Sequence, residues 1–140
     1  MSSKGPIIVI EDDEDDREFY ASAFENLNIE NEIIYFLEAE EAYSFLIDTP
    51  KQPFLIISDI NLPGMSGLDF RKRIKENDYL RKKSIPFVFI TTGNNKHSVE
   101  AAYDMMVQGY FVKPTSVSEL YMMLEQIVSY WKLCKHPNSI

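Results

Sequence analysis

Residues 54–64 read Phe54-Leu-Ile-Ile-Ser-Asp-Ile-Asn-Leu-Pro-Gly64. The apolar run at its start, without alternation, predicts a strand covered on both faces, as in a parallel sheet. Asp59 comes directly after this strand and before the turn signal Pro63-Gly64. A carboxylate at the carboxyl end of a core strand lies where α/β folds bind their ligands. Asp59 is therefore the first candidate for a functional residue.

Short apolar or β-branched runs predict five strands, over residues 6–10, 32–36, 54–58, 86–90 and 109–112. Apolar residues at helical spacing predict helices over residues 15–28, 38–48, 66–77, 98–107 and 116–133. Ser66, Ser98 and Ser116 are candidate N-caps of three of these helices. A strand followed by a helix, repeated five times, predicts a single-domain α/β fold: a doubly wound five-stranded parallel sheet with helices on both faces.

The length of 140 residues fits one domain, which we expect to cover residues 6–134 between an N-terminal tail (1–5) and a C-terminal tail (135–140). No apolar stretch with the length of a secretory signal (about 7–15 residues) follows Lys4, and no segment approaches the roughly 20 apolar residues of a membrane span. The single cysteine, Cys134, excludes an intramolecular disulfide. These features favour a cytoplasmic protein that does not contact membranes.

The formal net charge of −8 argues against nonspecific binding of nucleic acid, which depends on neutralising phosphates. Half of the 14 basic residues nevertheless fall in one segment, and they are Arg71, Lys72, Arg73, Lys75, Arg81, Lys82 and Lys83. This cluster can be a patch for a polyanion or a solvated helix face. The acids within it, Glu76 and Asp78, favour the helix face.

Polar residues follow four of the predicted strands, at the end where such folds bind ligands. They are Glu11, Asp12 and Asp13 after the first strand, Asp59 and Asn61 after the third, Thr91 and Thr92 after the fourth, and Lys113 after the fifth. Carboxylates gathered in one crevice repel one another, so at least one of their pKa values should rise unless a cation enters. Oxygen ligands without a nearby His or Cys select Mg²⁺ rather than zinc.

A carboxylate nucleophile, a Mg²⁺ ion, a hydroxyl and an ammonium are the parts of a phosphoryl-transfer site. Mg²⁺ and Lys113 would neutralise the oxygens of a phosphoryl group, to which Thr91 would also donate a hydrogen bond. Positioning and charge neutralisation are most of what phosphoryl transfer requires of a protein.

Four segments, in this order and each at the end of a predicted strand, resemble the receiver domain of bacterial two-component response regulators. They are Ile8-Val-Ile-Glu-Asp12, Ser58-Asp-Ile-Asn-Leu-Pro-Gly-Met-Ser-Gly67, Phe89-Ile-Thr-Thr92 and Gly109-Tyr-Phe-Val-Lys-Pro114. The resemblance runs from about Pro6 to Val128, and the chain is most similar to single-domain regulators without an output domain. It implies a flavodoxin-like sheet with strand order 2-1-3-4-5.

The resemblance implies that Asp59 is a phosphoacceptor, which takes a phosphoryl group from a sensor histidine kinase or a histidine phosphotransfer protein. It implies that Mg²⁺ is bound by the side chains of Asp12 and Asp59 and the backbone carbonyl of Asn61. Glu11 would reach the ion mainly through water. Such a protein is not an enzyme, because its only chemistry is self-phosphotransfer and autodephosphorylation.

The same resemblance implies roles at the ends of the fourth and fifth strands. Thr91 is similar to the switch hydroxyl and Thr92 lies beside it, where a smaller residue is common. Tyr110 is similar to the switch aromatic and Lys113 to the lysine that pairs with phosphate. A cis peptide bond is expected before Pro114, for which proline lowers the usual penalty.

Some of these assignments have alternatives. Asp13 replaces Asp12 as the metal ligand if the register differs by one residue, and Glu11 and Asp12 can simply be helix N-terminal acids. Tyr110 can be packed core without a switch role. We expect His97 to face solvent.

Output of such a domain passes through contact with another molecule, either a downstream protein or a second copy in a homodimer. The region 98–133 has more bulky residues than one buried helix stripe needs: Tyr103, Met106, Tyr121, Met122, Tyr130 and Trp131. Some of them should be exposed as a contact surface, unless all of them cover the core.

Two rival classes remain open. One is a receiver-like binding module that is never phosphorylated. The other is an aspartyl-phosphate phosphatase of the haloacid dehalogenase type, against which Asn61 stands, because that family has a second Asp at this position.

Overall fold

A parallel sheet of five strands forms the centre of the computed structural model, which describes residues 2–93 and 95–135. Its strands are β1 (Ile7–Ile10), β2 (Ile33–Phe36), β3 (Leu55–Ser58), β4 (Phe87–Thr91) and β5 (Gly109–Val112). Their order in the sheet is β2-β1-β3-β4-β5, and every pairing is parallel. The predicted fold class and strand order are confirmed.

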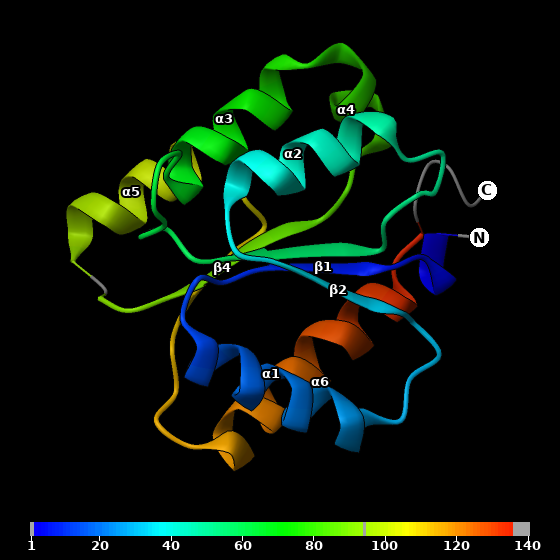
Figure 1. The fold of residues 1–140 in the computed structure, drawn as a ribbon, viewed down its shortest axis with the longest axis vertical. Helices are drawn as coiled ribbons and strands as arrows, with labels where there is room; N and C mark the ends of the chain where they lie inside the picture. Colours follow the sequence, from blue (N-terminus) through cyan, green and yellow to red (C-terminus); the bar gives the residue numbers. More distant parts are fainter. Residues whose placement is uncertain (1, 94, 136–140) are drawn as a thin grey trace.

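Helices cover both faces of the sheet (Figure 1). One face carries α1 (Glu14–Leu27) and α6 (Val117–Leu133), which lie side by side. The other face carries α2 (Ala39–Asp48), α3 (Gly67–Glu76), α4 (Asp78–Lys83) and α5 (Lys96–Asp104). A short 3₁₀ helix, η1 (Ser2–Lys4), precedes β1.

Each central strand contributes to two hydrophobic cores, because successive side chains of a strand point to opposite faces. Ile7 and Val9 of β1 pack in the core beneath α1 and α6. Ile8 and Ile10 pack in the core beneath the other helices, together with Phe70 of α3. The apolar runs without alternation in the sequence therefore reflect strands that are buried on both faces.

Two of the three predicted helix N-caps are confirmed. The side chain of Ser66 accepts a hydrogen bond from the backbone of Asp69, and that of Ser116 accepts one from Glu119. The assignment of Ser98 is wrong. Helix α5 begins at Lys96, two residues before Ser98. Its N-cap is Asn95, whose side chain accepts a hydrogen bond from the backbone N–H of Ser98 at 2.8 Å.

The short helix α4 is a difference from the sequence-based expectation, which ended the helical region at residue 77. Asn77 closes α3 and also caps α4, since its side chain accepts from the N–H of Leu80 at 2.9 Å. Leu80 is buried against the core of that face. A short basic segment with a single buried apolar residue shows little helical periodicity, so the sequence pattern could not reveal α4.

Three of the seven side chains in the basic cluster of the sequence are engaged in contacts within the protein. Arg71 donates to the backbone oxygens of Met105 and Met106, and Arg73 lies over the ring of Tyr43. Lys83 is buried and donates to backbone oxygens of the segment after α2. These three side chains are therefore engaged within the protein, which disfavours the polyanion site.

Ser3 and Gly5, which lie in the expected N-terminal tail (1–5), are hydrogen-bonded to the rest of the domain. The side-chain amide of Asn31 donates to the backbone oxygens of Ser3 and Gly5, and the ammonium of Lys132 in α6 donates to Ser3 at 2.5 Å. Apart from Lys135, the predicted C-terminal tail (135–140) lies outside the described residues, as does Met1. Within the described part of the chain, no helix combines the length and the apolar character of a membrane span.

We predict that Phe70→Ala lowers the free energy of unfolding by about 3–5 kcal/mol, because Phe70 is fully buried and packs on Phe87 with ring centroids 5.7 Å apart. Urea denaturation measures the change. Met122→Ala is the matched control, since Met122 is 58% exposed and should change the free energy by less than about 0.5 kcal/mol. Equal losses in the two variants would contradict the assignment of the core.

Candidate functional site

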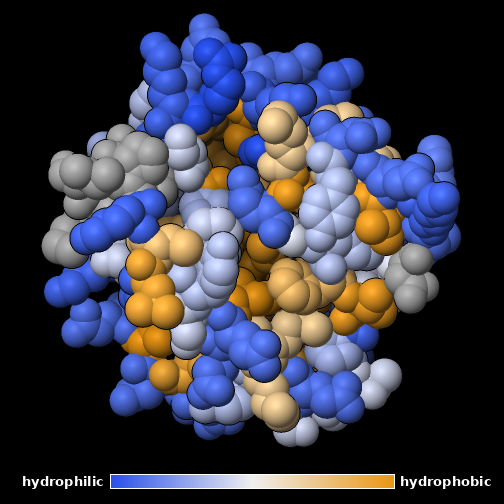
Figure 2. All heavy atoms as spheres, turned by 180° about the vertical axis from the view of Figure 1, so that it is seen from behind, coloured by the Kyte–Doolittle hydropathy of each residue, from blue (hydrophilic) through white to orange (hydrophobic). Residues whose placement is uncertain are grey.

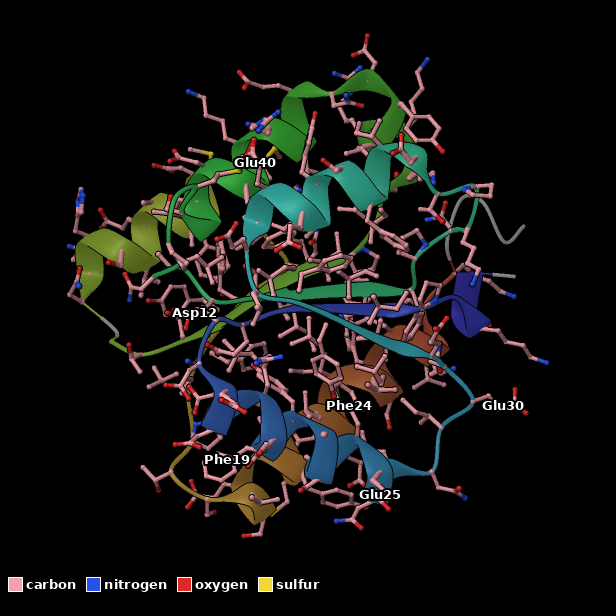
Figure 3. The ribbon with its side chains drawn as sticks, in the orientation of Figure 1. Asp12, Phe19, Phe24, Glu25, Glu30 and Glu40 are labelled. Carbon is pink, nitrogen blue, oxygen red and sulfur yellow. The ribbon has the colours of Figure 1, made fainter. Side chains whose placement is uncertain are left out.

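The carboxyl ends of four strands meet at one edge of the sheet. Ile10 of β1 is level with Ser58 of β3, which is level with Phe89 of β4. The residues that follow therefore emerge side by side. Figure 3 shows one of them, Asp12, at the end of the sheet where α1 begins.

Asp59 is buried at the centre of this edge and is only 5% exposed. Its Oδ1 accepts hydrogen bonds from the hydroxyl of Thr91 at 2.5 Å and from the backbone N–H of Asn61 at 3.0 Å. Its Oδ2 lies 2.7 Å from the ammonium nitrogen of Lys113. The carboxylate of Asp59 is thus held in place by one residue from β4, one from its own loop and one that follows β5.

The backbone of Asp59 is held by the start of α3. Gly67, the first residue of this helix, donates its N–H to the backbone oxygen of Ile60 at 2.8 Å. A Cβ atom at position 67 would lie 2.1 Å from the backbone oxygen of Asp59. Only glycine allows the helix to approach this backbone so closely.

The ammonium of Lys113 contacts three carboxylates. Its Nζ lies 2.8 Å from Glu11, 2.7 Å from Asp16 and 2.7 Å from Asp59. Desolvation lowers the pKa of Lys113, but the hydrogen bonds to Asp16, Asp59 and Glu11 outweigh it and raise the pKa above its ordinary value. Lys113 therefore keeps its positive charge at the centre of the site.

The expected rise of a pKa in the carboxylate cluster is found at Glu11. Burial raises the pKa of Glu11 from its ordinary value of 4.5 to about 7, and the negative charge of Asp59 adds to this rise. The attraction of Lys113 and the backbone hydrogen bond from Asp13 oppose it without cancelling it. Glu11 thus gains a proton more readily than an exposed glutamate does.

Three carboxylates of the site can hold a divalent cation. One oxygen from each of Glu11, Asp12 and Asp59 lies within 4.8 Å of the other two. Such oxygen ligands suit hard cations, and the charge of a cation would offset the repulsion among them. Asp12 is exposed and so leaves this group open to solvent on one side.

The neighbouring Asp13 has a different task. Its side chain is the N-cap of α1 and accepts a hydrogen bond from the N–H of Asp16 at 3.0 Å. The alternative in which Asp13 replaces Asp12 as a ligand is therefore disfavoured, because a capping carboxylate already has its partner at the helix end.

The ends of β4 and β5 lie together beside Asp59. Thr91 is buried, whereas Thr92 is exposed. Tyr110 is half-buried, with its ring against Phe89 at 6.5 Å between centroids, and its hydroxyl donates to the backbone oxygen of Gly93 at 2.9 Å. Tyr110 is thus tied to the loop that follows Thr91 and is not simply part of the core. His97 is exposed, as expected.

The expectation of a cis peptide bond before Pro114 is wrong, because the described residues contain no cis bond. The trans isomer of a bond before proline is favoured by about 0.5–1 kcal/mol. With a trans bond, the ammonium of Lys113 already reaches all three carboxylates. No cis bond is needed to place it.

Sequence reasoning missed Asp16, which it treated as one of several acids at a helix N-terminus. The signal that could have revealed Asp16 is its spacing. Tyr20 and Phe24 are buried, and Asp16 lies four residues before Tyr20 on the same face of α1. That face points inward, so a carboxylate there can reach Lys113 while it stays partly exposed.

The comparisons with known proteins agree with this geometry. Residues 7–125 match the family model of the response regulator receiver domain, and the chain belongs to this family. It is 30% identical over 130 residues to response regulator Rcp1 of Synechocystis, covering 89% of this chain and 87% of that protein. It is 32% identical over 125 residues to chemotaxis protein CheY1 of Helicobacter pylori, covering 87% of this chain and 95% of that protein.

Solved structures show the same fold. The phosphorylated cyanobacterial phytochrome response regulator RcpA superposes with a TM-score of 0.85 at 26% identity, covering 96% of this chain and 98% of that one. The Mn²⁺-bound form of Rcp1 superposes with a TM-score of 0.81 at 30% identity, covering 96% and 99%. The chain is therefore a receiver domain of two-component signalling systems, with an acidic cluster that can hold a metal.

We predict that folding stability depends on pH through Glu11. Between pH 4.5 and about 7, the folded protein keeps a proton on Glu11 that the unfolded chain has released, so the free energy of unfolding falls as the pH rises through this range. Glu11→Gln cannot release this proton. Relative to that variant, the wild type should lose about 2–3 kcal/mol across the range.

Urea denaturation at a series of pH values, in buffer with a chelator of divalent cations, measures this difference. If the wild type and Glu11→Gln gave parallel profiles, the raised pKa of Glu11 would be refuted.

Proposed function

We propose that this receiver domain is the phosphoacceptor of a two-component phosphorelay and that Asp59 takes the phosphoryl group from a phosphohistidine of a sensor kinase or phosphotransfer protein. The observation that carries the proposal is the setting of the Asp59 carboxylate. It lies between the hydroxyl of Thr91 and the ammonium of Lys113, beside two further carboxylates. This is the donor and charge arrangement that an acyl phosphate requires.

In the proposed reaction, an oxygen of Asp59 attacks phosphorus, the bond from phosphorus to the histidine nitrogen breaks, and the neutral imidazole leaves after it takes up a proton. Lys113 neutralises charge on the transferred oxygens, and Thr91 donates a hydrogen bond to one of them. Asp12, Asp59, the carbonyl of Asn61 and Glu11 would hold Mg²⁺, which would neutralise further charge on these oxygens when bound. Two similar proteins, solved as a phosphorylated RcpA and a Mn²⁺-bound Rcp1, support both parts by analogy.

The phosphoryl group would act as a switch by changing two hydrogen bonds that are present in this structure. The Thr91 hydroxyl now bonds Asp59, and the hydroxyl of Tyr110 bonds Gly93 in the loop just beyond Thr91. A shift of Thr91 toward phosphoryl oxygens would move this loop and release Tyr110 from it. The position of Tyr110 would then depend on whether Asp59 is phosphorylated, and its movement would change the surface formed by β5, α5 and α6.

The proposed output surface consists of α5, β5 and α6, whose apolar side chains are partly open to solvent. As expected, Tyr103, Met106, Met122 and Tyr130 are each at least half exposed, while Tyr121 and Trp131 are half-buried. Figure 2, seen from behind the view of Figure 1, shows hydrophobic residues grouped across the middle of that face. Exposed apolar groups of this kind favour contact with a downstream protein or a second copy of the chain.

The rival classes fit the site less well. A phosphatase of the haloacid dehalogenase type needs a second acid two residues after the nucleophile, and here Asn61 contributes its backbone N–H to Asp59. A module that is never phosphorylated has no need for a half-buried lysine that faces the acceptor.

We predict that incubation with acetyl phosphate and Mg²⁺ adds one phosphoryl group to the protein, seen by intact mass spectrometry. Asp59→Asn should take up none, because the nucleophilic oxygen is removed. Asp13→Asn is the matched control and should react like the wild type, since Asn is an equally good N-cap and Asp13 lies outside the acidic cluster. A wild type that stays unmodified would favour the pure binding module.

We also predict that Gly93→Asn shortens the lifetime of the phosphorylated protein by about two- to tenfold, the effect of one added hydrogen bond. Gly93 has φ +80°, and a Cβ atom at this position would meet no other atom within 4 Å. An amide side chain there has room to reach the water that attacks the acyl phosphate. Asn is chosen because it tolerates positive φ better than other residues.

The decay of the phosphorylated proteins in Mg²⁺ buffer is followed by mass. Gly93→Ala is the control, because it imposes the same backbone strain without an amide. Equal lifetimes of the Asn and Ala variants would refute the role of this position.

A further inference from the structure

Asp16 is the carboxylate at the site for which the proposed phosphoacceptor function has no role. Its Oδ2 lies 2.7 Å from Nζ of Lys113, as close as the acceptor Asp59 does. It is not part of the group of Glu11, Asp12 and Asp59 that can share a cation. Its charge therefore acts on Lys113 rather than on the metal ligands.

The position of Asp16 is fixed by the helix that carries it. Asp16 lies in the first turn of α1, where its backbone N–H is bound by the N-cap Asp13 at 3.0 Å. One turn later on the same face, Tyr20 is buried against the sheet. Because the helix is anchored at both points, the carboxylate of Asp16 is held toward the end of β5, where Lys113 emerges.

The ammonium of Lys113 lies among three carboxylates in this structure, and Asp16 is the one that accepts a hydrogen bond from it, at 2.7 Å. An ammonium has three N–H donors. Glu11, Asp16 and Asp59 each provide an oxygen within 2.8 Å of Nζ. A phosphoryl group on Asp59 that draws the ammonium of Lys113 toward itself must therefore compete with the hydrogen bond to Asp16.

The three contacts differ in what phosphorylation does to them. Asp59 loses its negative charge when one of its oxygens becomes an acyl phosphate, and Glu11 stays beside the metal ligands. Asp16 keeps its charge and its place on α1. It therefore remains as an anion that attracts Lys113 away from the phosphoryl oxygens and repels those oxygens.

We propose that Asp16 is a positioning residue, which holds the ammonium of Lys113 in the unphosphorylated protein and competes with the phosphoryl group for it. This inference rests on the proposed phosphoacceptor function. The contact with Asp16 therefore stabilises the unphosphorylated protein relative to the phosphorylated one. This stabilisation adds to any that the acceptor, the metal ligands and Lys113 provide without Asp16. Removing the charge of Asp16 should make the site bind a phosphoryl group more tightly.

The test uses beryllofluoride, a mimic of the phosphoryl group, at saturating Mg²⁺, with binding followed by fluorine NMR on the full chain. Asp16→Asn should bind the mimic about three- to tenfold more tightly than the wild type, as expected for the loss of one nearby charge at a partly exposed site. Saturating Mg²⁺ keeps a change in cation affinity out of the comparison. A gain of affinity also cannot come from a poorly folded variant.

Two variants separate the contact with Lys113 from net charge and from side-chain size. Asp15→Asn removes the same charge from the same helix turn, but Asp15 is exposed and has no ion pair with Lys113 among the described contacts. The affinity of this variant for beryllofluoride should differ from that of the wild type by less than about twofold. Asp16→Glu keeps the charge and should bind like the wild type.

Each result is decisive. If Asp16→Asn binds the mimic no more tightly than Asp15→Asn, or if Asp16→Glu binds as tightly as Asp16→Asn, the positioning role is overturned. If the wild type binds no mimic and takes up no phosphoryl group, the proposed function itself fails and the inference falls with it.

Discussion

One ammonium group, that of Lys113, holds together an edge of the sheet that would otherwise be repulsive. Glu11 follows β1, Asp16 lies in α1 and Asp59 follows β3, so three segments bring negative charge to the same place. Burying these carboxylates costs free energy unless each has a partner. Lys113, at the end of β5, is that partner, and the parallel register of the strands brings it there.

The architecture of the fold could be predicted because it depends on simple periodicity. Buried strands such as β1 and β3 appear as continuous apolar runs, and the serines at positions 66 and 116 mark helix starts by their chemistry alone. The strand ends could also be predicted, since in a parallel sheet they share one edge. The site was therefore visible as a set of residues before any contact was known.

What the sequence could not provide were contacts that depend on direction rather than pattern. Helix α4 has a single core anchor, Leu80, and Asn95 competes with Ser98 for the same helix start, so neither boundary has a distinct pattern. Asp12 and Asp13 are chemically identical neighbours, yet one faces the site and the other caps a helix. The role of Asp16 appears only once the inward face of α1 is known, and the trans bond before Pro114 departs from what a family resemblance implied.

The contact between η1 and α6 joins regions that are distant in sequence. Lys132, in the last turn of α6, donates to the backbone of Ser3 and to the side chain of Asn31, which itself holds Ser3 and Gly5. The beginning of the chain therefore serves as a support for the final helix. An affinity tag or a fusion partner that displaced Ser3 would therefore weaken the attachment of α6 to the rest of the domain, far from the acidic residues of the site.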